Sequence, residues 1–264
     1  MDKKLKIALA QLNPLVGDVS GNIDKLISIR AGLKDDVDIL VAPELYVSGY
    51  PIDDLVLRED FLNLVEKEIN KLADSTKDKK SAIIVGAPRK DNNSIKNSVF
   101  VIENGKIISI KDKYELPNTG VFDEQRIFKQ GSLEDCIDIK GVKFGLPICE
   151  DIWEKTVLEK LSKSGAEIII AINASPFTVS KNEERESVTK LRVNETKLPI
   201  VYLNRTGGQD ELIFDGSSFA LNHDGKKFYN SSEFKEETAQ ISFQKTNGKW
   251  AGQGNLNNNS SSTE

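Results

Sequence analysis

Cys149 is the residue whose type and position most favour chemistry. It ends the apolar stretch Gly145–Ile148 and is followed by two acidic residues and Trp153. A thiol at a strand end projects from a strand-to-turn corner into a crevice, where its thiolate is a strong nucleophile. The alternative is a buried cysteine that serves as a small apolar side chain. Cys136, in a segment that alternates apolar with acidic residues, fits that alternative.

The chain contains a single histidine, His223, within the turn signal Leu221–Gly225 between two predicted strands. We expect this side chain to be solvated and to take no part in catalysis. A Cys–His or Ser–His dyad therefore has no base, and a histidine-based metal site has no ligand set. Nucleophilic catalysis in this chain must take its base from a carboxylate, a lysine or a tyrosine.

Glu44 and Lys113 are the other candidates for chemistry. Glu44 follows Pro43 at the end of a short apolar run, a position where a carboxylate otherwise caps a loop or pairs with a nearby lysine. Lys113 is one of 36 basic residues, so by itself it indicates nothing. Glu, Lys and Cys at the ends of three predicted strands, in that order, form a stronger signal together than any one of them does alone.

The elements that must position these residues alternate along the chain. Hydrophobic patterns predict strands over 6–12, 38–42, 81–87, 143–148, 167–173 and 200–204, and helices that begin after a Ser20 cap and over 59–73, 156–163 and 182–196. Hairpins are predicted at 99–110 around Asn104-Gly105, and at 214–229 around Asp224-Gly225. Strands interleaved with helices and hairpins predict an α/β protein with a mixed sheet.

Length and composition are those of an ordinary globular protein. The chain has 264 residues, which one hydrophobic core can fill, so we expect one domain over 1–247, although two are possible. The segment 248–264 is polar and of low complexity, so we expect it to be a disordered tail or linker.

Charge, hydrophobic runs and cysteine count argue against several classes of protein. The net charge is −5 with no clustered basic run, so no nucleic-acid partner is expected. The apolar run 5–12 is interrupted by Lys6 and Gln11 and stopped by Pro14, which argues against a signal peptide, and no segment approaches the about 20 apolar residues of a membrane span. With two cysteines no disulfide scaffold is expected. We expect a soluble, cytoplasmic protein without a membrane partner.

The motifs around the candidate residues resemble the nitrilase superfamily of carbon–nitrogen hydrolases, whose members use a Glu–Lys–Cys triad in this order. The resemblance runs from about Lys6 to about Gly225. The stretches Cys149-Glu-Asp-Ile-Trp and Gly207-Gly-Gln-Asp-Glu favour one branch over generic amidases, the glutaminase domains of glutamine-dependent NAD+ synthetases.

The resemblance implies a nitrilase-like four-layer αββα sandwich with mixed sheets. It implies that Cys149 is the nucleophile, Glu44 the general base and Lys113 the electrostatic stabiliser, and Glu124 matches a second glutamate that often lies beside the triad. Ser175 and Lys181 match positions that bind the amino-acid end of glutamine, and Glu150 and Thr119 are further predicted substrate contacts. Thr119 stands where that branch usually has tyrosine.

The physical chemistry agrees with these roles. A free thiol is only partly ionised at neutral pH, and we expect the Lys113 ammonium to favour the thiolate. Glu44 accepts the thiol proton and passes it to the departing nitrogen. Lys113 and the backbone N–H after Cys149 then hold the oxyanion.

The implied function is hydrolysis of glutamine to glutamate and ammonia, with the ammonia supplied to a synthetase domain or subunit. The Ser-Gly-Gly-x-Asp-Ser loop of that domain occurs nowhere in the chain, so we expect the synthetase domain to be absent and no ATP or other cofactor site here. A homo-oligomer is expected. Two alternatives remain: a free-standing ω-amidase or nitrilase-like hydrolase of another small amide, and a non-catalytic interaction module. The second of these would have lost a triad residue, whereas all three are present.

Overall fold

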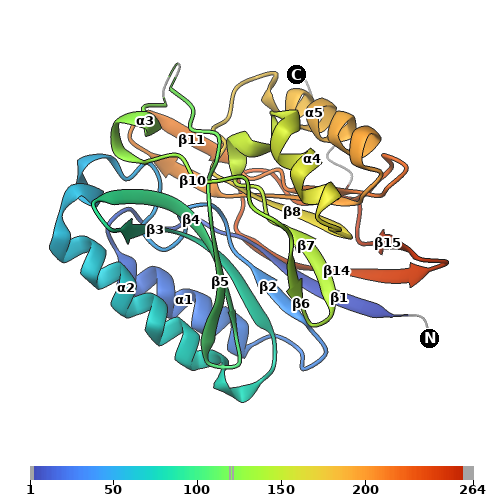
Figure 1. Cartoon of the computed structure of the whole chain (residues 1–264), viewed down its shortest axis with the longest axis horizontal. Helices are drawn as coiled ribbons and strands as arrows, with labels where there is room; N and C mark the ends of the chain where they lie inside the picture. Colours follow the sequence, from blue (N-terminus) through green and yellow to red (C-terminus); the bar gives the residue numbers. More distant parts are fainter. Residues whose placement is uncertain (1–2, 119, 121, 258–264) are drawn as a thin grey trace.

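The computed structural model describes residues 3–118, 120 and 122–257 of the chain, which form two mixed β-sheets packed face to face between two pairs of helices (Figure 1). Within these residues the first sheet has seven strands in the order β15-β14-β1-β2-β3-β4-β5. They are β1 (Lys4–Gln11), β2 (Ile39–Val41), β3 (Ala82–Asp91), β4 (Ser94–Glu103), β5 (Lys106–Asp112), β14 (Glu237–Thr246) and β15 (Lys249–Gln253).

The second sheet has, among the described residues, six strands in the order β13-β12-β9-β8-β7-β6. They are β6 (Ile137–Ile139), β7 (Val142–Gly145), β8 (Ile168–Asn173), β9 (Ile200–Asn204), β12 (Phe219–Leu221) and β13 (Lys227–Asn230). A separate hairpin joins β10 (Thr206–Gln209) to β11 (Leu212–Asp215). The short helix α3 (Glu124–Ile127) and the 3-10 turns η1 (Asp53–Leu57), η2 (Ser75–Asp78) and η3 (Cys149–Ile152) lie in the connections.

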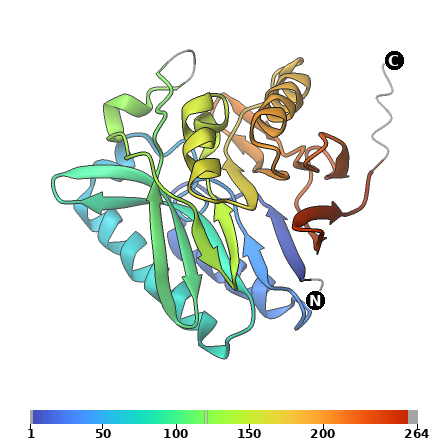
Figure 2. The same cartoon turned by 45° about the vertical axis from the view of Figure 1, so that its right-hand side comes forward.

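Three apolar cores hold four layers together. Helices α1 (Val19–Ala31) and α2 (Glu59–Asp74) cover the outer face of the first sheet, and α4 (Lys155–Lys163) and α5 (Lys181–Thr196) cover the outer face of the second, as Figures 1 and 2 both show. The period of two along a strand divides its side chains between cores: Ile7 and Leu9 of β1 face the second sheet, while Ala8 and Ala10 face α1 and α2. The predicted four-layer αββα sandwich is confirmed.

Parallel pairing at the centre of each sheet sets the place where the candidate residues meet. Strands β1, β2 and β3 are parallel, as are β7, β8 and β9. Glu44 follows β2, Cys149 follows β7 and Ala174 follows β8. Strand β5 runs in the same direction as β3, because two antiparallel pairings separate them, and Lys113 follows β5. The carboxyl ends of these strands are where α/β proteins build their sites.

The predicted elements are present, with local differences in their boundaries. Helix α1 is capped by Asp18, whose Oδ1 accepts a hydrogen bond from Gly21 N at 3.0 Å, rather than by Ser20. The strand predicted from residue 214 is divided into β11 and β12, and between them the backbone N–H of Ser218 donates to the side-chain oxygen of Gln11 at 3.1 Å instead of to a neighbouring strand.

The expected disorder of 248–264 is wrong for its first residues. Strand β15 pairs antiparallel with β14 through a turn at Asn247-Gly248, in which both residues have positive φ. Trp250 is 2% exposed and joins the core between the sheets, so one large apolar side chain anchors a segment of otherwise polar composition. Residues 258–264 lie outside the described part of the chain. Among the described helices, none has the length and apolar character needed to cross a membrane.

Candidate active site

Lys113 lies at the centre of a buried polar cluster between the two sheets. Its Nζ donates to Glu44 Oε1 at 2.8 Å and to both oxygens of Glu124 at 2.9 Å. The lysine and Glu44 side chains are each 1% exposed. Three of the four predicted catalytic residues meet here through these contacts: Glu44, Lys113 and Glu124.

Glu44 is fixed by donors from three directions. Besides Lys113, Asn97 Nδ2 donates to Oε1 at 2.8 Å and the backbone N–H of Ala174 donates to Oε2 at 2.9 Å. The loop that carries Glu44 crosses β3 at Gly86, where a Cβ would stand 2.4 Å from Leu45 N. The absence of a side chain at this position therefore allows the carboxylate to lie over the sheet.

Cys149 occupies a sharp turn directly after β7. Its φ is +48°, a left-handed conformation that non-glycine residues adopt at a cost on the order of 1–3 kcal/mol and that often marks a functional site. Ile148 forms a parallel bridge to Ile172 of β8, and η3 begins at the cysteine itself. The thiol is therefore held at a strand-to-turn corner, as the sequence predicted.

Burial has the largest effect on the pKa of the Cys149 thiol. Burial raises the pKa of Cys149 well above its usual range, and the Glu44 carboxylate raises it further. The Lys113 ammonium does act to lower the pKa, but it does not offset these two effects. The expected direction of the Lys113 effect is therefore confirmed, while burial, which the sequence argument omitted, outweighs it. Glu44, the predicted base, is the carboxylate with the largest effect on the thiol pKa.

The charges of Lys113 and Glu124 depend on each other. Burial alone would lower the pKa of Lys113, yet the carboxylates of Glu124 and Glu44 outweigh burial and raise this pKa well above its usual range. Burial raises the pKa of Glu124 to about 7, although Lys113 opposes the shift. Tyr50 Oη also donates to Glu124 at 3.2 Å. Lys113 therefore stays cationic and cannot serve as a proton acceptor.

The predicted substrate contacts lie around this cluster at different depths. Burial raises the pKa of the half-buried Glu150, and the charges of Lys113 and Lys181 oppose that shift, so both cations interact with this carboxylate. Lys181 Nζ lies 4.2 Å from the centre of the Trp153 ring and 3.3 Å from Glu184 Oε2. Thr119 lies outside the described residues.

Ser175 is buried in a second polar network, next to the residue whose N–H binds Glu44. Its Oγ accepts from Arg185 Nε at 3.1 Å, and its carbonyl accepts from Arg185 Nη2 at 2.8 Å. Arg185 in turn forms an ion pair with Asp215, and both side chains are fully buried. His223 lies in the turn between β12 and β13, as predicted, but it is half-buried and not fully solvated.

Sequence reasoning missed the residues that hold the predicted ones. Asn97 and Tyr50 bind Glu44 and Glu124, while Arg185 and Asp215 hold Ser175. Asn97 lies within β4, in a stretch with no local signal of function. Two of the missed residues do lie in stretches that resemble the family: Tyr50 in Ser48-Gly-Tyr-Pro and Asp215 in Phe214-Asp-Gly.

The fold is that of the carbon–nitrogen hydrolases. Residues 6–251 match the carbon–nitrogen hydrolase family, and the chain belongs to that family. It is similar to the glutamine-dependent NAD+ synthetase of Rhodobacter capsulatus, with 37% identity over 251 residues that cover 95% of this chain and 45% of that protein. The synthetase of Acinetobacter baylyi is 38% identical over 238 residues, which cover 89% of this chain and 43% of that protein.

Solved structures give the same relationship. The glutamine-dependent NAD+ synthetase of Acinetobacter baumannii superposes with a TM-score of 0.88 at 34% identity, over 97% of this chain and 48% of that one. An amidase from Nesterenkonia sp. has a TM-score of 0.76 at 17% identity, over 89% of each chain, and shows the fold alone. The resemblance inferred from the motifs is confirmed, and the chain spans less than half the length of these synthetases.

Proposed function

We propose that this chain hydrolyses the side-chain amide of glutamine to glutamate and ammonia through a thioester on Cys149. The observation that carries the proposal is the buried Lys113 ammonium, bound to Glu44 and Glu124 and close enough to Cys149 to act on its thiol pKa. In this arrangement the thiol of Cys149 is the nucleophile, the carboxylate of Glu44 is the base, and the ammonium of Lys113 stabilises the oxyanion.

The reaction follows from these groups. Glu44 takes the thiol proton as Cys149 Sγ attacks the amide carbon, and Lys113 with the backbone N–H of Glu150 stabilises the oxyanion. The carbon–nitrogen bond then breaks, and Glu44 returns the proton to the nitrogen, which leaves as ammonia. Water attacks the γ-glutamyl thioester with Glu44 again as base. The thiol is regenerated and glutamate departs.

Glutamine is the proposed substrate because of the charges at the edge of the cluster. An amino acid carries an ammonium and a carboxylate on one carbon, and Glu150 and Lys181 offer the two opposite charges. The names of the synthetases at 37% and 38% identity point to the same substrate. We propose in addition that a synthetase domain or subunit receives the ammonia, because the matched relatives are about twice as long as this chain.

A diazoketone analogue of glutamine tests the proposal. The wild type should gain one adduct, which peptide mapping places on Cys149, and excess glutamine should slow its formation. Cys149→Ala should gain no adduct and should lose glutamine hydrolysis. Cys136→Ala is the matched control, since Cys136 is half-buried with its thiol directed to the carbonyl of Ser164, and it should behave as wild type.

The outcome also separates the alternative activities. Full glutamine turnover by Cys149→Ala would exclude the mechanism. A panel of small amides and nitriles identifies a different hydrolase if one of them is turned over with a higher kcat/KM than glutamine. Absence of both adduct and turnover in the wild type would favour a non-catalytic module.

A further inference from the structure

Asp151 is a buried carboxylate that the proposed mechanism does not use. It lies two residues after the nucleophile and is 3% exposed. Its Oδ2 accepts a hydrogen bond from the backbone N–H of Ile148 at 2.9 Å. Its Oδ1 accepts from the backbone N–H groups of Tyr114 at 3.1 Å and Glu115 at 2.7 Å. One side chain therefore binds the residue before Cys149 and the two residues after Lys113.

We propose that Asp151 is a positioning residue for hydrolysis, because its carboxylate ties the turn that carries Cys149 to the segment that carries Lys113. This inference rests on the proposed function, since it assigns the residue to that reaction. Asp151 touches neither substrate nor reacting atoms in this proposal, and it acts by holding the nucleophile and the oxyanion stabiliser at a fixed separation.

The two tied segments belong to different sheets. Lys113 follows β5 of the seven-stranded sheet, and its backbone N–H donates to Asn97 O of that sheet at 2.8 Å. Cys149 follows β7 of the six-stranded sheet. Backbone ladders hold each residue to its own sheet, but a ladder does not fix one sheet against the other. Asp151 makes a polar connection between the sheets within a few residues of both groups.

Asp151 also closes the turn around the cysteine. Its backbone N–H donates to Ile148 O at 3.1 Å, while its side chain accepts from Ile148 N. These reciprocal bonds flank Cys149, whose φ of +48° needs support from its surroundings. The same carboxylate thus sets both the conformation of the nucleophile and its distance from the lysine.

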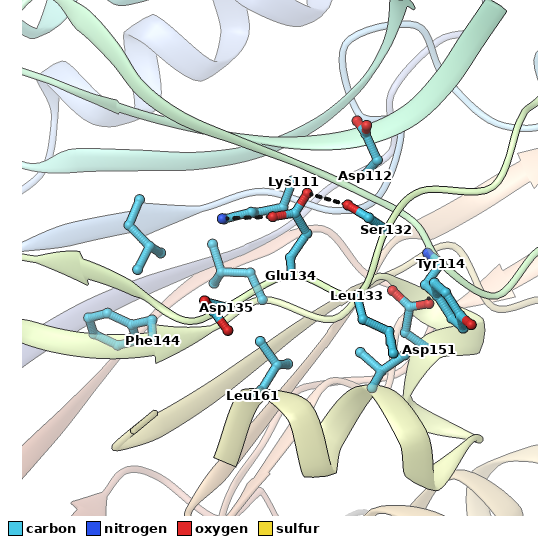
Figure 3. Close-up of a pocket in the computed structure, with 13 residues that line it drawn as sticks. Lys111, Asp112, Tyr114, Ser132, Leu133, Glu134, Asp135, Phe144, Asp151 and Leu161 are labelled. Carbon is cyan, nitrogen blue, oxygen red and sulfur yellow. Dashed lines mark hydrogen bonds and ion pairs between the residues drawn. The ribbon is translucent and has the colours of Figure 1, made fainter. Parts of the chain in front are cut away.

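The surroundings of Asp151 make its contacts specific. Asp151 and Tyr114 line a cavity of about 20 Å³, to which Leu133 and Leu161 contribute apolar side chains. Figure 3 shows how these side chains lie. A space of this size holds about one water molecule. Burial raises the pKa of Asp151 to about 7, against the effect of the bound N–H groups. Only an acceptor with two oxygens satisfies donors on both sides.

Asp151→Asn tests this tie, the hydrogen bonds from Asp151 to the backbone at 148 and at 114–115, with little change in the shape of the side chain. Asparagine keeps one acceptor oxygen and presents N–H groups to the remaining donors, so one of the two connections is lost. We expect kcat for glutamine to fall by about 10- to 100-fold, because small displacements of reacting groups have effects of this size, with little change in KM. Hydrogen exchange of the amides at 114–115 or at 148 should become faster than in the wild type.

Leu72→Ala is the control for a general loss of stability. Leu72 is fully buried on α2, which packs on the outer face of the first sheet, so its truncation lowers the unfolding temperature without touching the tie. It should leave kcat and the exchange of those three amides close to wild type. If Asp151→Asn does not fold, Asp151→Ser provides one acceptor in a smaller side chain and carries the same expectations.

The proposal is overturned if Asp151→Asn lowers kcat no more than Leu72→Ala does. It is also overturned if Asp151→Asn lowers kcat/KM only by raising KM. Unchanged exchange at all three amides overturns it as well. A wild type that does not hydrolyse glutamine contradicts the proposed function alone. In that case the alkylation of Cys149 by iodoacetamide still tests the tie: an altered dependence on pH in Asp151→Asn supports it, and a profile superimposable on wild type contradicts it.

Discussion

Arg185 and Asp215 form an ion pair at 2.9 Å in which neither side chain has any exposed surface. Nη2 of the guanidinium donates to the carbonyls of Ser175 and Pro176, both at 2.8 Å. A buried pair thus holds the backbone that follows β8, one residue beyond the N–H that binds Glu44. The pair connects the stability of this layer with the geometry of the site.

Arg185→Met should reduce the free energy of unfolding by about 3–5 kcal/mol, because it leaves the Asp215 charge buried without a partner. It should also raise KM for glutamine more than it lowers kcat, since Ser175 is a proposed substrate contact. Urea denaturation and steady-state kinetics measure the two effects. Lys190→Met, which removes an exposed partner of Glu186, should cost less than about 1 kcal/mol. Equal costs for the two variants would contradict the role of the buried pair.

Glu44→Gln should retain the fold and an alkylatable thiol but lose turnover. The amide keeps an oxygen for the Ala174 N–H or the Lys113 ammonium, yet it cannot accept the thiol proton. His223→Ala is the control and should be nearly silent, because the histidine lies in a hairpin turn. Steady-state glutaminase assays decide the point. A dead His223→Ala enzyme with an active Glu44→Gln enzyme would reverse the assignment of the base.

Lys113→Met should lower kcat by about 10²–10³-fold, the usual effect of losing one oxyanion donor. It should also raise the pH at which Cys149 alkylates, because the ammonium acts to lower the thiol pKa. The stability cost should be on the order of 3–5 kcal/mol, since Glu44 and Glu124 are left buried without their cation.

Lys111→Met serves as the control for the same charge change. Lys111 pairs with Glu134 at 3.1 Å on the edge strand β5, two residues before Lys113. Its removal should change neither the alkylation profile nor kcat. Identical profiles for wild type and both variants would show that Lys113 does not influence the thiol.

Glu124 should make stability depend on pH with a defined sign. Burial raises its pKa to about 7 from 4.5, so the folded state binds the proton more tightly than the unfolded state does. The stabilisation of the folded state by protonated Glu124 is therefore fully present below about pH 4.5 and is lost as pH rises through about 7. Relative to Glu124→Gln, the wild type should lose on the order of 2 kcal/mol between pH 5 and pH 8. The same difference in free energy of unfolding between wild type and Glu124→Gln at pH 5 and at pH 8 would contradict this shift of the Glu124 pKa.

Sequence patterns located the catalytic candidates because chemistry at strand ends leaves a local signature. Glu44 follows an apolar run and a proline, and Cys149 ends another, so each was visible without the fold. Their partners were not visible, because Asn97 is 53 residues from Glu44 and Tyr50 is 74 residues from Glu124. Only the packing of the strands brings such residues together.

Other features were missed for the same reason: they depend on packing, which the local sequence does not show. Strand β14 buries few of its residues and is rich in polar ones, so hydrophobic periodicity gave no sign of it. Trp250 was assigned to a disordered tail because its neighbours are polar, although it fills a place between the sheets. The effect of burial on the thiol pKa was missed, because burial, unlike a charge, cannot be read from one position in the sequence.

The hydrogen bond from Ala174 N to Glu44 joins residues 130 positions apart and belonging to different sheets. Contacts of such long sequence separation form late, because most of the chain must already be ordered before the ends of so large a loop can meet. The proposed base therefore reaches its working position only when the two halves of the molecule have docked. Recovery of activity during refolding should lag behind the formation of secondary structure, so an activity assay would measure the last stage of folding.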